Sequence, residues 1–243
     1  MIIIACGKGG CGKSTISSLL AREYARQGKN ILVIDTDESN YGLHRQLGCE
    51  LPKNLTEYFG GRTDIMKAKT EDAILFDKKW TISDIPSEYV SENAGVKLVA
   101  IGKIDEANEG CACAMGVLTK NLLPNLDLGE NDVVLIDSEA GVEHFGRGVD
   151  NQVDHIMMVI DPSYESLRLA GKVGSMGAEL GKEVFYVLNK ADEMQVESMK
   201  EAMGDKKIAA VIYANRDVLQ KGLMGEALDI QLDEITKLSN ALA

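Results

Sequence analysis

The sequence predicts an α/β fold in which a mostly parallel sheet of seven or eight strands carries helices on both faces. Short apolar runs alternate with longer helical patterns along the chain. Several of these runs are continuously apolar, as in strands that are covered on both faces. Such alternation is typical of parallel strands joined by crossover helices. Because no linker, repeat or low-complexity tract interrupts the pattern, we expect residues 1–243 to form one domain.

The elements can be placed in chain order from these runs. Strands are expected at residues 2–6, 31–35, 97–101, 133–137, 156–160, 184–188 and 208–212. Helical periods lie between them, for example at 163–180 and 194–203, and the less regular region 41–93 predicts helices and loops at one edge. Ligands of such sheets bind at the carboxyl ends of the strands. The polar residues that follow each run are therefore candidates for a functional site.

The composition excludes some classes of molecule as binding partners of this protein. The net charge of −12 argues against a nucleic-acid partner and against an anionic membrane surface. No stretch reaches membrane-spanning length, and the amphipathic pattern at 227–242 is acidic, unlike a membrane-seeking helix. We therefore expect a soluble cytoplasmic protein. In that compartment the 5 cysteines are expected to be thiols or metal ligands rather than disulfides.

A glycine-rich loop follows the first predicted strand. Residues 7–15 read Gly-Lys-Gly-Gly-Cys-Gly-Lys-Ser-Thr, which fits the phosphate-binding pattern Gly-x-x-x-x-Gly-Lys-Ser, and a helical pattern follows at once. Glycines let successive N–H groups turn toward phosphate oxygens. Lys13 is expected on the β- and γ-phosphates and the Ser14 hydroxyl on Mg²⁺. The residues expected to bind nucleotide here are Gly9, Gly10, Cys11, Gly12, Lys13, Ser14 and Thr15.

The loop contains a second lysine, Lys8, which an ordinary phosphate loop does not need. The segment resembles the deviant Walker A loop of the MinD/ParA/nitrogenase iron-protein ATPases, which are P-loop NTPases. In that superfamily the extra lysine reaches across a dimer interface to the nucleotide of the partner. The resemblance implies that Lys8 is catalytic, supplying positive charge to the transferred phosphoryl group. The alternative is a solvated lysine on a loop.

Carboxylates follow two of the predicted strands. Asp35 and Asp37 end the second strand, and Asp137 ends the fourth in the Walker B form of apolar residues followed by aspartate. The resemblance implies that Asp35 and Asp137 serve Mg²⁺ together with Ser14, and that Asp37 orients or deprotonates the attacking water. The division of roles between Asp35 and Asp37 stays open, and Asp37 could instead cap a helix. Gly141 matches a glycine whose N–H can meet a γ-phosphate.

The sixth strand runs into residues 189–192, Asn-Lys-Ala-Asp, which fit the guanine-reading pattern Asn-Lys-x-Asp. GTP is therefore an alternative ligand. The deviant-loop relatives mostly use ATP, keeping the asparagine for the adenine amino group, and Asp192 could instead cap the next helix. We favour ATP. The residues expected near the base are Asn189, Lys190, Tyr213, Ala214 and Asn215.

Cys111 and Cys113 form a Cys-x-Cys pair. Two thiolates at this spacing can chelate one soft or borderline metal ion, but they fill only half of a tetrahedral shell. A two-fold dimer would supply four sulfurs, so nucleotide binding could assemble or open a metal site between subunits. The alternative is two small buried residues at the start of a helix.

The whole chain resembles the CooC-type accessory ATPases of carbon monoxide dehydrogenase. The resemblance rests on the loop at 7–14, on Gly-Cys-Ala-Cys at 110–113 and on Ala-Gly-Val-Glu-His-Phe-Gly-Arg-Gly at 140–148. It implies a Mg²⁺-dependent ATPase that forms a homodimer. Cys111 and Cys113 of both subunits would hold Ni²⁺, a site that Zn²⁺ can also occupy, and apo carbon monoxide dehydrogenase would be the client.

Three other functions remain open. One is an iron–sulfur reductase or carrier on the same scaffold. Nitrogenase-type iron proteins have a cysteine just after Walker B and cluster-scaffold relatives have a C-terminal Cys-x-x-Cys, and this sequence has neither, but its adjacent cysteine pair could still bind a cluster in a dimer. A MinD/ParA-like switch would need a basic surface or a membrane-binding tail. A GTP-dependent nickel protein for hydrogenase or urease would have an ordinary phosphate loop and often a His-rich tract, whereas this chain has only 3 His.

Overall fold

Eight strands form one sheet in the computed structural model, which describes residues 1–104, 113–142 and 148–243. The strand order is β3-β4-β2-β5-β1-β6-β7-β8, and every neighbouring pair is parallel except β3 with β4. The strands are β1 (Ile2–Cys6), β2 (Asn30–Asp35), β3 (Ser91–Asn93), β4 (Val96–Ala100), β5 (Asp132–Asp137), β6 (His155–Ile160), β7 (Glu183–Ala191) and β8 (Ile208–Tyr213).

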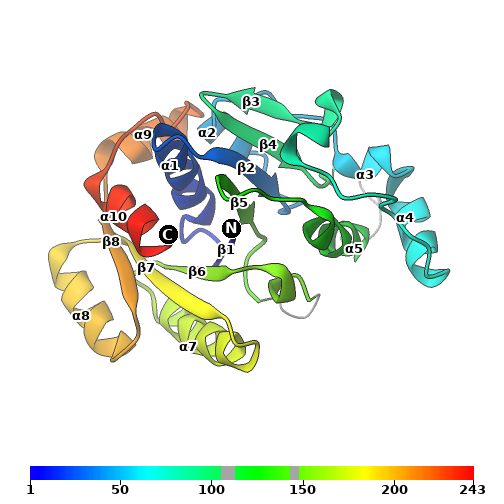
Figure 1. Cartoon of the computed structure of the whole chain (residues 1–243). Helices are drawn as coiled ribbons and strands as arrows, with labels where there is room; N and C mark the ends of the chain where they lie inside the picture. The colour runs from blue at the N-terminus through cyan, green and yellow to red at the C-terminus, as the bar shows by residue number, and fades with distance from the viewer. Residues whose placement is uncertain (105–112, 143–147) are drawn as a thin grey trace.

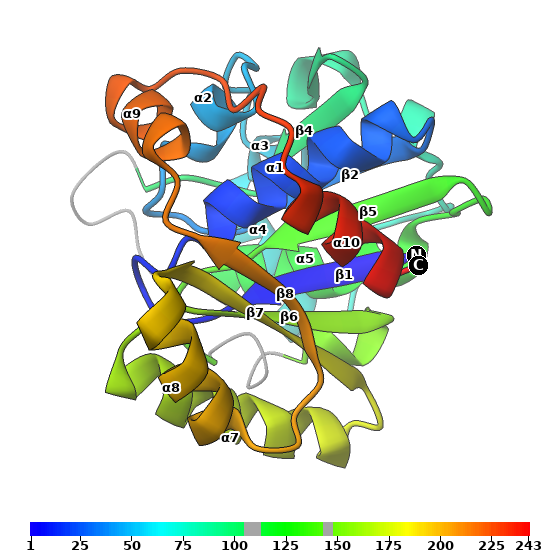
Figure 2. The same cartoon turned by 90° about the vertical axis from the view of Figure 1, so that its left-hand side faces the viewer.

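Helices cover both faces of this sheet (Figures 1 and 2). The α-helices of the described residues are α1 (Lys13–Arg26), α2 (Leu43–Gln46), α3 (Leu55–Tyr58), α4 (Gly61–Thr70), α5 (Cys113–Leu122), α7 (Tyr164–Glu179), α8 (Glu193–Met203), α9 (Arg216–Met224) and α10 (Asp233–Ala241). The short 3-10 helices are η1 (Ile82–Asp84), η2 (Ser87–Tyr89), η3 (Leu123–Asn125) and η4 (Asp150–Gln152).

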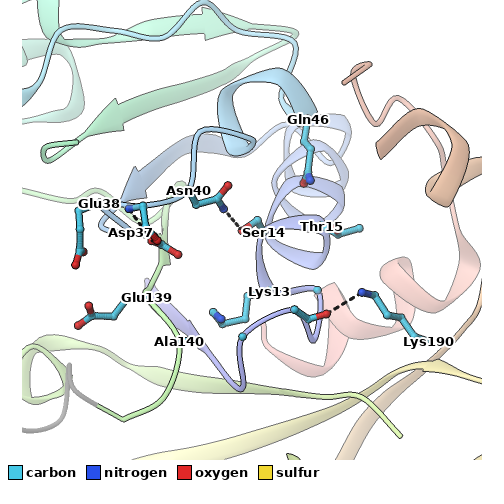
Figure 3. A pocket seen from close by; sticks show the side chains of 14 residues that line it. Lys13, Ser14, Thr15, Asp37, Glu38, Asn40, Gln46, Glu139, Ala140 and Lys190 are labelled. Atoms are coloured by element: carbon cyan, nitrogen blue, oxygen red, sulfur yellow. Dashed lines mark hydrogen bonds between the residues drawn. The ribbon is translucent and has the colours of Figure 1, made fainter. Parts of the chain in front are cut away.

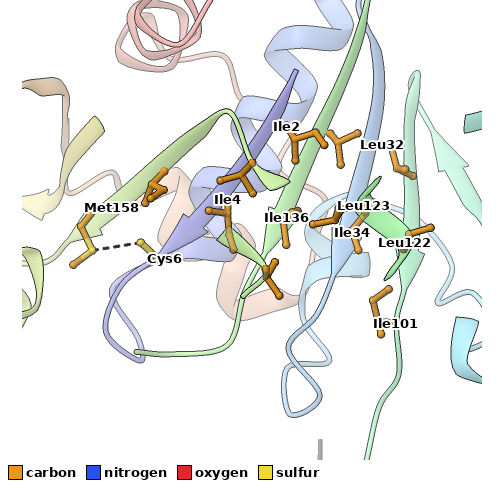
Figure 4. Packing of buried hydrophobic residues seen from close by; sticks show 14 of the residues in the cluster. Ile2, Ile4, Cys6, Leu32, Ile34, Ile101, Leu122, Leu123, Ile136 and Met158 are labelled. Atoms are coloured by element: carbon orange, nitrogen blue, oxygen red, sulfur yellow. Dashed lines mark hydrogen bonds between the residues drawn. The ribbon is translucent and has the colours of Figure 1, made fainter. Parts of the chain in front are cut away.

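Alternate residues of each central strand enter two separate hydrophobic cores. In β1, Ile3 and Ala5 belong to the core that contains residues of α1 and α10, whereas Ile2, Ile4 and Cys6 belong to the core that contains residues of α5, α7 and α8. Figure 4 shows part of the second core, with Cys6 beside Met158 of β6. All five side chains are buried. Burial on both faces explains why the central strands are apolar throughout instead of alternating between apolar and polar residues.

The centre of the sheet positions the functional site. β1 lies between β5 and β6, so the chain crosses from one side of β1 to the other after β5. The loop after β1 therefore emerges where the carboxyl ends of β1, β2 and β5 come together, which is the position at which doubly wound sheets bind ligands.

The structure confirms the predicted fold class, and the seven predicted strands agree within a few residues with observed ones. The eighth, β3, is the antiparallel edge strand, which the sequence analysis assigned to helices and loops. Its sequence Ser-Glu-Asn has no apolar pattern to reveal it. Among the described residues, no helix is both long and apolar enough to span a bilayer.

Candidate functional site: a phosphate-binding pocket

A pocket of about 670 Å³ opens over the loop between β1 and α1 (Figure 3). The loop glycines Gly7, Gly10 and Gly12 all have positive φ, so the backbone curls sharply before α1 begins at Lys13. The described residues that line the pocket are Gly9, Gly10, Gly12, Lys13, Ser14, Thr15, Asp37, Glu38, Ser39, Asn40, Gln46, Glu139, Ala140 and Lys190.

Two of these glycines are required for different reasons. A Cβ on Gly12 would lie 2.4 Å from Nδ2 of Asn189, and φ there is +101°. A Cβ on Gly10, at φ +79°, would meet nothing within 4 Å. The space at Gly12 is therefore closed by a neighbouring side chain, whereas Gly10 requires glycine for its backbone conformation alone.

Lys13 lies at the base of the pocket with only 7% of its surface exposed. Its Nζ donates to the carbonyl oxygens of Gly7 at 3.2 Å and Lys8 at 3.4 Å. In the described part of the chain no carboxylate pairs with this ammonium group. A buried cation without a counter-ion is suited to bind an anionic phosphate at a helix N-terminus.

Ser14 and Asp137, both predicted for magnesium, are in direct contact. The Ser14 hydroxyl donates to Oδ2 of Asp137 at 2.6 Å and accepts from Nδ2 of Asn40 at 2.8 Å, while Ser17 donates to Oδ1 of Asp137 at 3.1 Å. Burial raises the pKa of Asp137, although the Ser14 hydrogen bond and the charge of Lys13 oppose that shift. Hydroxyl and carboxylate oxygens are ligands that Mg²⁺ accepts, so these residues fit that cation.

Asp37 lines the pocket, whereas Asp35 does not. Oδ1 of Asp37 accepts from the Ser39 N–H at 3.0 Å and from its hydroxyl at 2.7 Å. α2 begins only at Leu43, so Asp37 caps no helix. Its carboxylate is thus positioned on a pocket loop, as a residue that orients water would need to be.

Asp35 is buried in an ion pair with Lys103, at 2.6 Å from Oδ2 to Nζ, and its Oδ1 accepts the Asp37 N–H at 3.1 Å. Burial raises the pKa of Asp35 to about 7, with Lys103 opposing the shift. Each carboxylate oxygen accepts one hydrogen bond from the protein, and Asp35 is not among the described residues that line the pocket, so the magnesium role stays a prediction. Lys103 lies far from Asp35 in sequence, and no motif marked it.

The carboxyl end of β7 supports the phosphate loop. Asn189 is buried and its side-chain amide donates to the Cys11 carbonyl oxygen at 2.8 Å. Lys190 lines the pocket and donates to the Gly10 carbonyl oxygen at 2.8 Å. Cys11 itself is fully buried in the core with α1. Asn189 and Lys190 thus contact the phosphate loop, and the contact with the base that the sequence predicts for them stays a prediction.

Asp192 and Asn215, which follow β7 and β8, both cap helices, and the base contacts predicted for Tyr213, Ala214 and Asn215 stay predictions. Asp192 caps α8, because its Oδ1 accepts the Gln195 N–H at 2.8 Å and the Gln195 side chain returns a bond to the Asp192 N–H. Asn215 likewise caps α9. Tyr213, Ala214 and Asn215 are not among the described residues lining the pocket. The capping alternative for Asp192 is thus the one that the geometry bears out.

Lys8 turns away from the pocket of its own chain. Its Nζ lies 3.2 Å from Oδ2 of Asp161 and donates to the Ser163 hydroxyl at 3.0 Å. Partial burial raises the pKa of Asp161, but hydrogen bonds from Ser163 and Ser166 and the contact with Lys8 outweigh it, so that pKa lies below its ordinary value. The carboxylate is therefore ionised at neutral pH and holds the lysine.

Gly141, expected to face a γ-phosphate, donates its N–H to the Gly7 carbonyl oxygen at 3.1 Å. This bond ties the segment after β5 to the phosphate loop. A γ-phosphate that took this N–H would have to separate the two segments.

Only one cysteine of the Cys-x-Cys pair lies among the described residues. Cys113 begins α5 and is exposed, whereas Cys111 lies outside the described residues. Cys113 is disulfide-bonded in the structure, so the expectation of a thiol is wrong there; an exposed cysteine is open to oxidation. Cys11 and Cys49 are buried free thiols, and Cys6 is buried with its Sγ 3.8 Å from Sδ of Met158. The described ranges contain no group of three or more His, Cys, Asp or Glu residues suited to hold a metal.

Several pocket residues escaped the sequence analysis. Glu38, Ser39 and Asn40 follow Asp37 directly, and Glu139 and Ala140 follow Asp137 closely. Their position just beyond the carboxyl ends of β2 and β5 was the available signal. No such signal in the sequence marked Gln46, which lies in α2.

These features define a P-loop nucleotide-binding protein. Residues 2–227 match the family described as the CobQ/CobB/MinD/ParA nucleotide binding domain, and the chain belongs to that family.

Particular relatives refine the comparison. The chain is 48% identical over 240 residues to an uncharacterized ATP-binding protein of Methanocaldococcus jannaschii, covering 97% of this chain and 96% of that protein. It is 35% identical over 198 residues to the carbon monoxide dehydrogenase accessory protein CooC of Rhodospirillum rubrum, covering 78% and 74%. The fold is similar to septum site-determining protein MinD of Pyrococcus horikoshii, complexed with Mg-ADP, at a TM-score of 0.72 and 21% identity, covering 99% and 95%.

Proposed function

We propose that this chain is a cytoplasmic, Mg²⁺-dependent ATPase whose nucleotide state controls a homodimer, and that the dimer carries nickel to an apo carbon monoxide dehydrogenase. The observation that carries the ATPase proposal is the phosphate loop, whose Lys13 lines a pocket together with Ser14 and Asp37, while Asp137 accepts the Ser14 hydroxyl. The likeness to CooC supports the metal cargo and its client.

In the proposed reaction Lys13 leaves the carbonyl oxygens of Gly7 and Lys8 and binds the β- and γ-phosphates. When bound, Mg²⁺ supplies positive charge to the phosphate oxygens, held by the Ser14 hydroxyl with Asp137 behind it. Asp37 orients the water that attacks the γ-phosphorus atom, in line with the departing ADP oxygen. Catalysis then consists mainly of positioning and charge stabilisation.

Lys8 acts in the partner's site. Within one subunit its ammonium group contacts Asp161 and Ser163, away from the pocket. Dimerisation on ATP releases it from Asp161 and brings its ammonium group to the nucleotide of the other subunit. Hydrolysis removes the γ-phosphate that attracts it, and the dimer loosens.

ATP is the proposed nucleotide. A guanine-reading aspartate accepts hydrogen bonds from the base, whereas Asp192 holds the N-terminus of α8 through a capping box. Comparing the turnover of ATP with that of GTP tests this choice. A higher kcat/KM for GTP would favour the GTP-dependent nickel protein instead.

The cargo site consists of Cys111 and Cys113 from both subunits, with Ni²⁺ as the proposed ion and Zn²⁺ as a second occupant. Thiolate is the sulfur form that binds metal, so the disulfide at Cys113 must be reduced before loading. This requirement makes the metal affinity dependent on a reducing agent.

The decisive experiment titrates the reduced apo protein with Ni²⁺, with and without Mg²⁺ and a non-hydrolysable ATP analogue, while light scattering follows its mass. One tightly bound ion per dimer, lost in both Cys111→Ala and Cys113→Ala with ATP hydrolysis retained, supports the proposal. Cys49→Ala, which removes a buried free thiol, is the matched control.

Other outcomes identify the alternatives. A brown purified protein with iron and sulfide would indicate a cluster carrier or reductase. Nucleotide-dependent dimers that bind no metal would indicate a MinD/ParA-like switch, with which the fold is also compatible. A protein that remains monomeric under every condition would refute the proposal.

A further inference from the structure

Lys103 is a buried lysine that the proposed reaction does not use. It follows β4 and has only 2% of its surface exposed. Its ammonium group donates at 2.6 Å to three oxygen atoms: Oδ2 of Asp35 and the backbone carbonyl oxygens of Asp37 and Asn40. A lysine has three N–H donors, so every donor of this side chain is used.

All three acceptors belong to the pocket loop or to the strand that carries it. Asp35 ends β2, while Asp37 and Asn40 line the phosphate-binding pocket. The Asn40 side chain also donates to the Ser14 hydroxyl, the proposed magnesium ligand. A continuous set of hydrogen bonds therefore runs from the phosphate loop through Asn40 to Lys103.

The backbone around Lys103 adds contacts to the same loop. The Ile104 N–H donates to the Glu38 carbonyl oxygen at 3.1 Å, and the Tyr41 hydroxyl donates to the Ile104 carbonyl oxygen at 2.8 Å. On the other side, Arg62 of α4 donates to the Lys103 carbonyl oxygen at 2.6 Å. Residues 101–104 are thus hydrogen-bonded to residues 35–41, and Lys103 is also hydrogen-bonded to α4.

A merely structural role accounts poorly for this arrangement. An ion pair in a protein interior gives little net stability compared with well-packed apolar side chains, because both charges lose their hydration. The pair here also satisfies two backbone carbonyl groups of a loop that borders the pocket. Its distinctive effect is to fix that loop relative to residues 101–104.

We propose that Lys103 is a positioning residue that couples the pocket loop, residues 36–41, to residues 101–104. Binding of Mg²⁺ with a nucleoside triphosphate takes the Ser14 hydroxyl and so displaces Asn40. Because Lys103 holds the carbonyl oxygens of Asp37 and Asn40, this displacement moves residues 101–104. The sequence continues from there to Cys111, so the coupling would regulate the cargo site; this last consequence rests on the proposed function.

Hydrogen exchange measures the coupling directly. The parent protein is compared with and without Mg²⁺ and a non-hydrolysable ATP analogue, and amide exchange is followed in peptides covering 36–41 and 101–104. The nucleotide is expected to change exchange in both segments. In Lys103→Met/Asp35→Asn, which leaves no unpaired buried charge, the change is expected to persist in 36–41 and to vanish in 101–104.

Two further variants sharpen the test. Tyr41→Phe removes one hydroxyl contact to Ile104 and leaves the ion pair, so it should fold normally and reduce the change in 101–104 by about half. Lys207→Met, which removes an exposed lysine paired with Glu183, should behave as the parent. If the double variant does not fold, Tyr41→Phe decides: a full parental response in 101–104 then overturns the coupling.

The same coupling predicts the ratio between the Ni²⁺ affinities measured with and without nucleotide. Coupling between two sites commonly changes affinity by roughly 5- to 150-fold. In the parent, the nucleotide should change Ni²⁺ affinity by a factor in that range, and in the double variant by less than about twofold on the same scale. A parent that binds no Ni²⁺ but shows the exchange coupling refutes the cargo proposal alone. A double variant that responds in 101–104 as the parent does refutes the role of Lys103 alone.

Discussion

Substituting Asp161 by asparagine tests whether the contact between Lys8 and Asp161 restrains dimer formation. The pair has Nζ and Oδ2 at 3.2 Å, with 37% and 18% of the two side chains exposed. A pair this exposed is worth about 0.2–1 kcal/mol. The introduced amide would keep an oxygen for the Ser163 hydroxyl but would lose the charge that holds the ammonium group, so the Lys8 side chain becomes available at lower cost.

The size of the effect follows from the symmetry of the dimer. Two lysines are released for each dimer formed, so Asp161→Asn should favour the ATP-bound dimer by about 1–2 kcal/mol if each pair contributes near its upper limit. Since 1.4 kcal/mol is tenfold in affinity, the dimer Kd should fall by about 5- to 30-fold. Sedimentation velocity with Mg²⁺ and a non-hydrolysable ATP analogue measures this constant.

The controls isolate Lys8 as the cause. Glu165→Gln removes the same charge from an exposed position in the first turn of α7 and should leave the Kd at the parental value. Lys8→Ala should weaken the dimer and slow turnover. Adding Asp161→Asn to Lys8→Ala should then change nothing further, which is the test of coupling in a double-mutant cycle. A Kd in Asp161→Asn equal to or weaker than the parental value would show that the contact does not restrain the lysine.

Three further substitutions address the pocket. Lys13→Ala removes hydrogen bonds to charged phosphate, worth about 1.5–3 kcal/mol, so calorimetry should show ATP affinity lowered roughly 10- to 150-fold; unchanged affinity would exclude the phosphate role. Gly12→Ala brings a Cβ to 2.4 Å from Asn189 at φ +101°, so ATP affinity and melting temperature should both fall, and a parental melting curve would contradict the geometry. Asp192→Ala removes a helix cap and should lower the free energy of unfolding by about 1 kcal/mol in urea titrations while leaving the preference for ATP over GTP unchanged; a shift in that preference would restore the base-reading role.

The fold could be predicted because local signals agreed with it. The buried runs at β1, β2, β5 and β6 are apolar on both faces, and the glycine pattern after β1 specifies a turn that few other residues can adopt. β3 gave no such signal. An edge strand of three polar residues is held by its pairing with β4, and that contact depends on the folded sheet.

The site was predictable where each of its residues belongs to a short motif that the sequence shows. Ser14 and Asp137 meet as expected, because strand order brings the ends of β1 and β5 together. Asp35 and Asp192 show the limit of this reasoning. Each is an aspartate in or beside a motif, and its partner in the folded chain, Lys103 in one case and the N-terminus of α8 in the other, carries no signal in the sequence.

The charges around the pocket bear on the proposal that a second subunit completes the site. Among the described lining residues, Lys13 and Lys190 face three carboxylates, those of Asp37, Glu38 and Glu139. In the proposed reaction a divalent cation and Lys8 of the partner subunit add positive charge to that of Lys13 and Lys190 when a triphosphate binds. Lys8 can provide that charge to a neighbouring copy once it leaves Asp161. In the proposed cycle the restraint on Lys8 and the acidity of the pocket act together, so hydrolysis is expected to be favoured only when nucleotide, Mg²⁺ and a second subunit are all present.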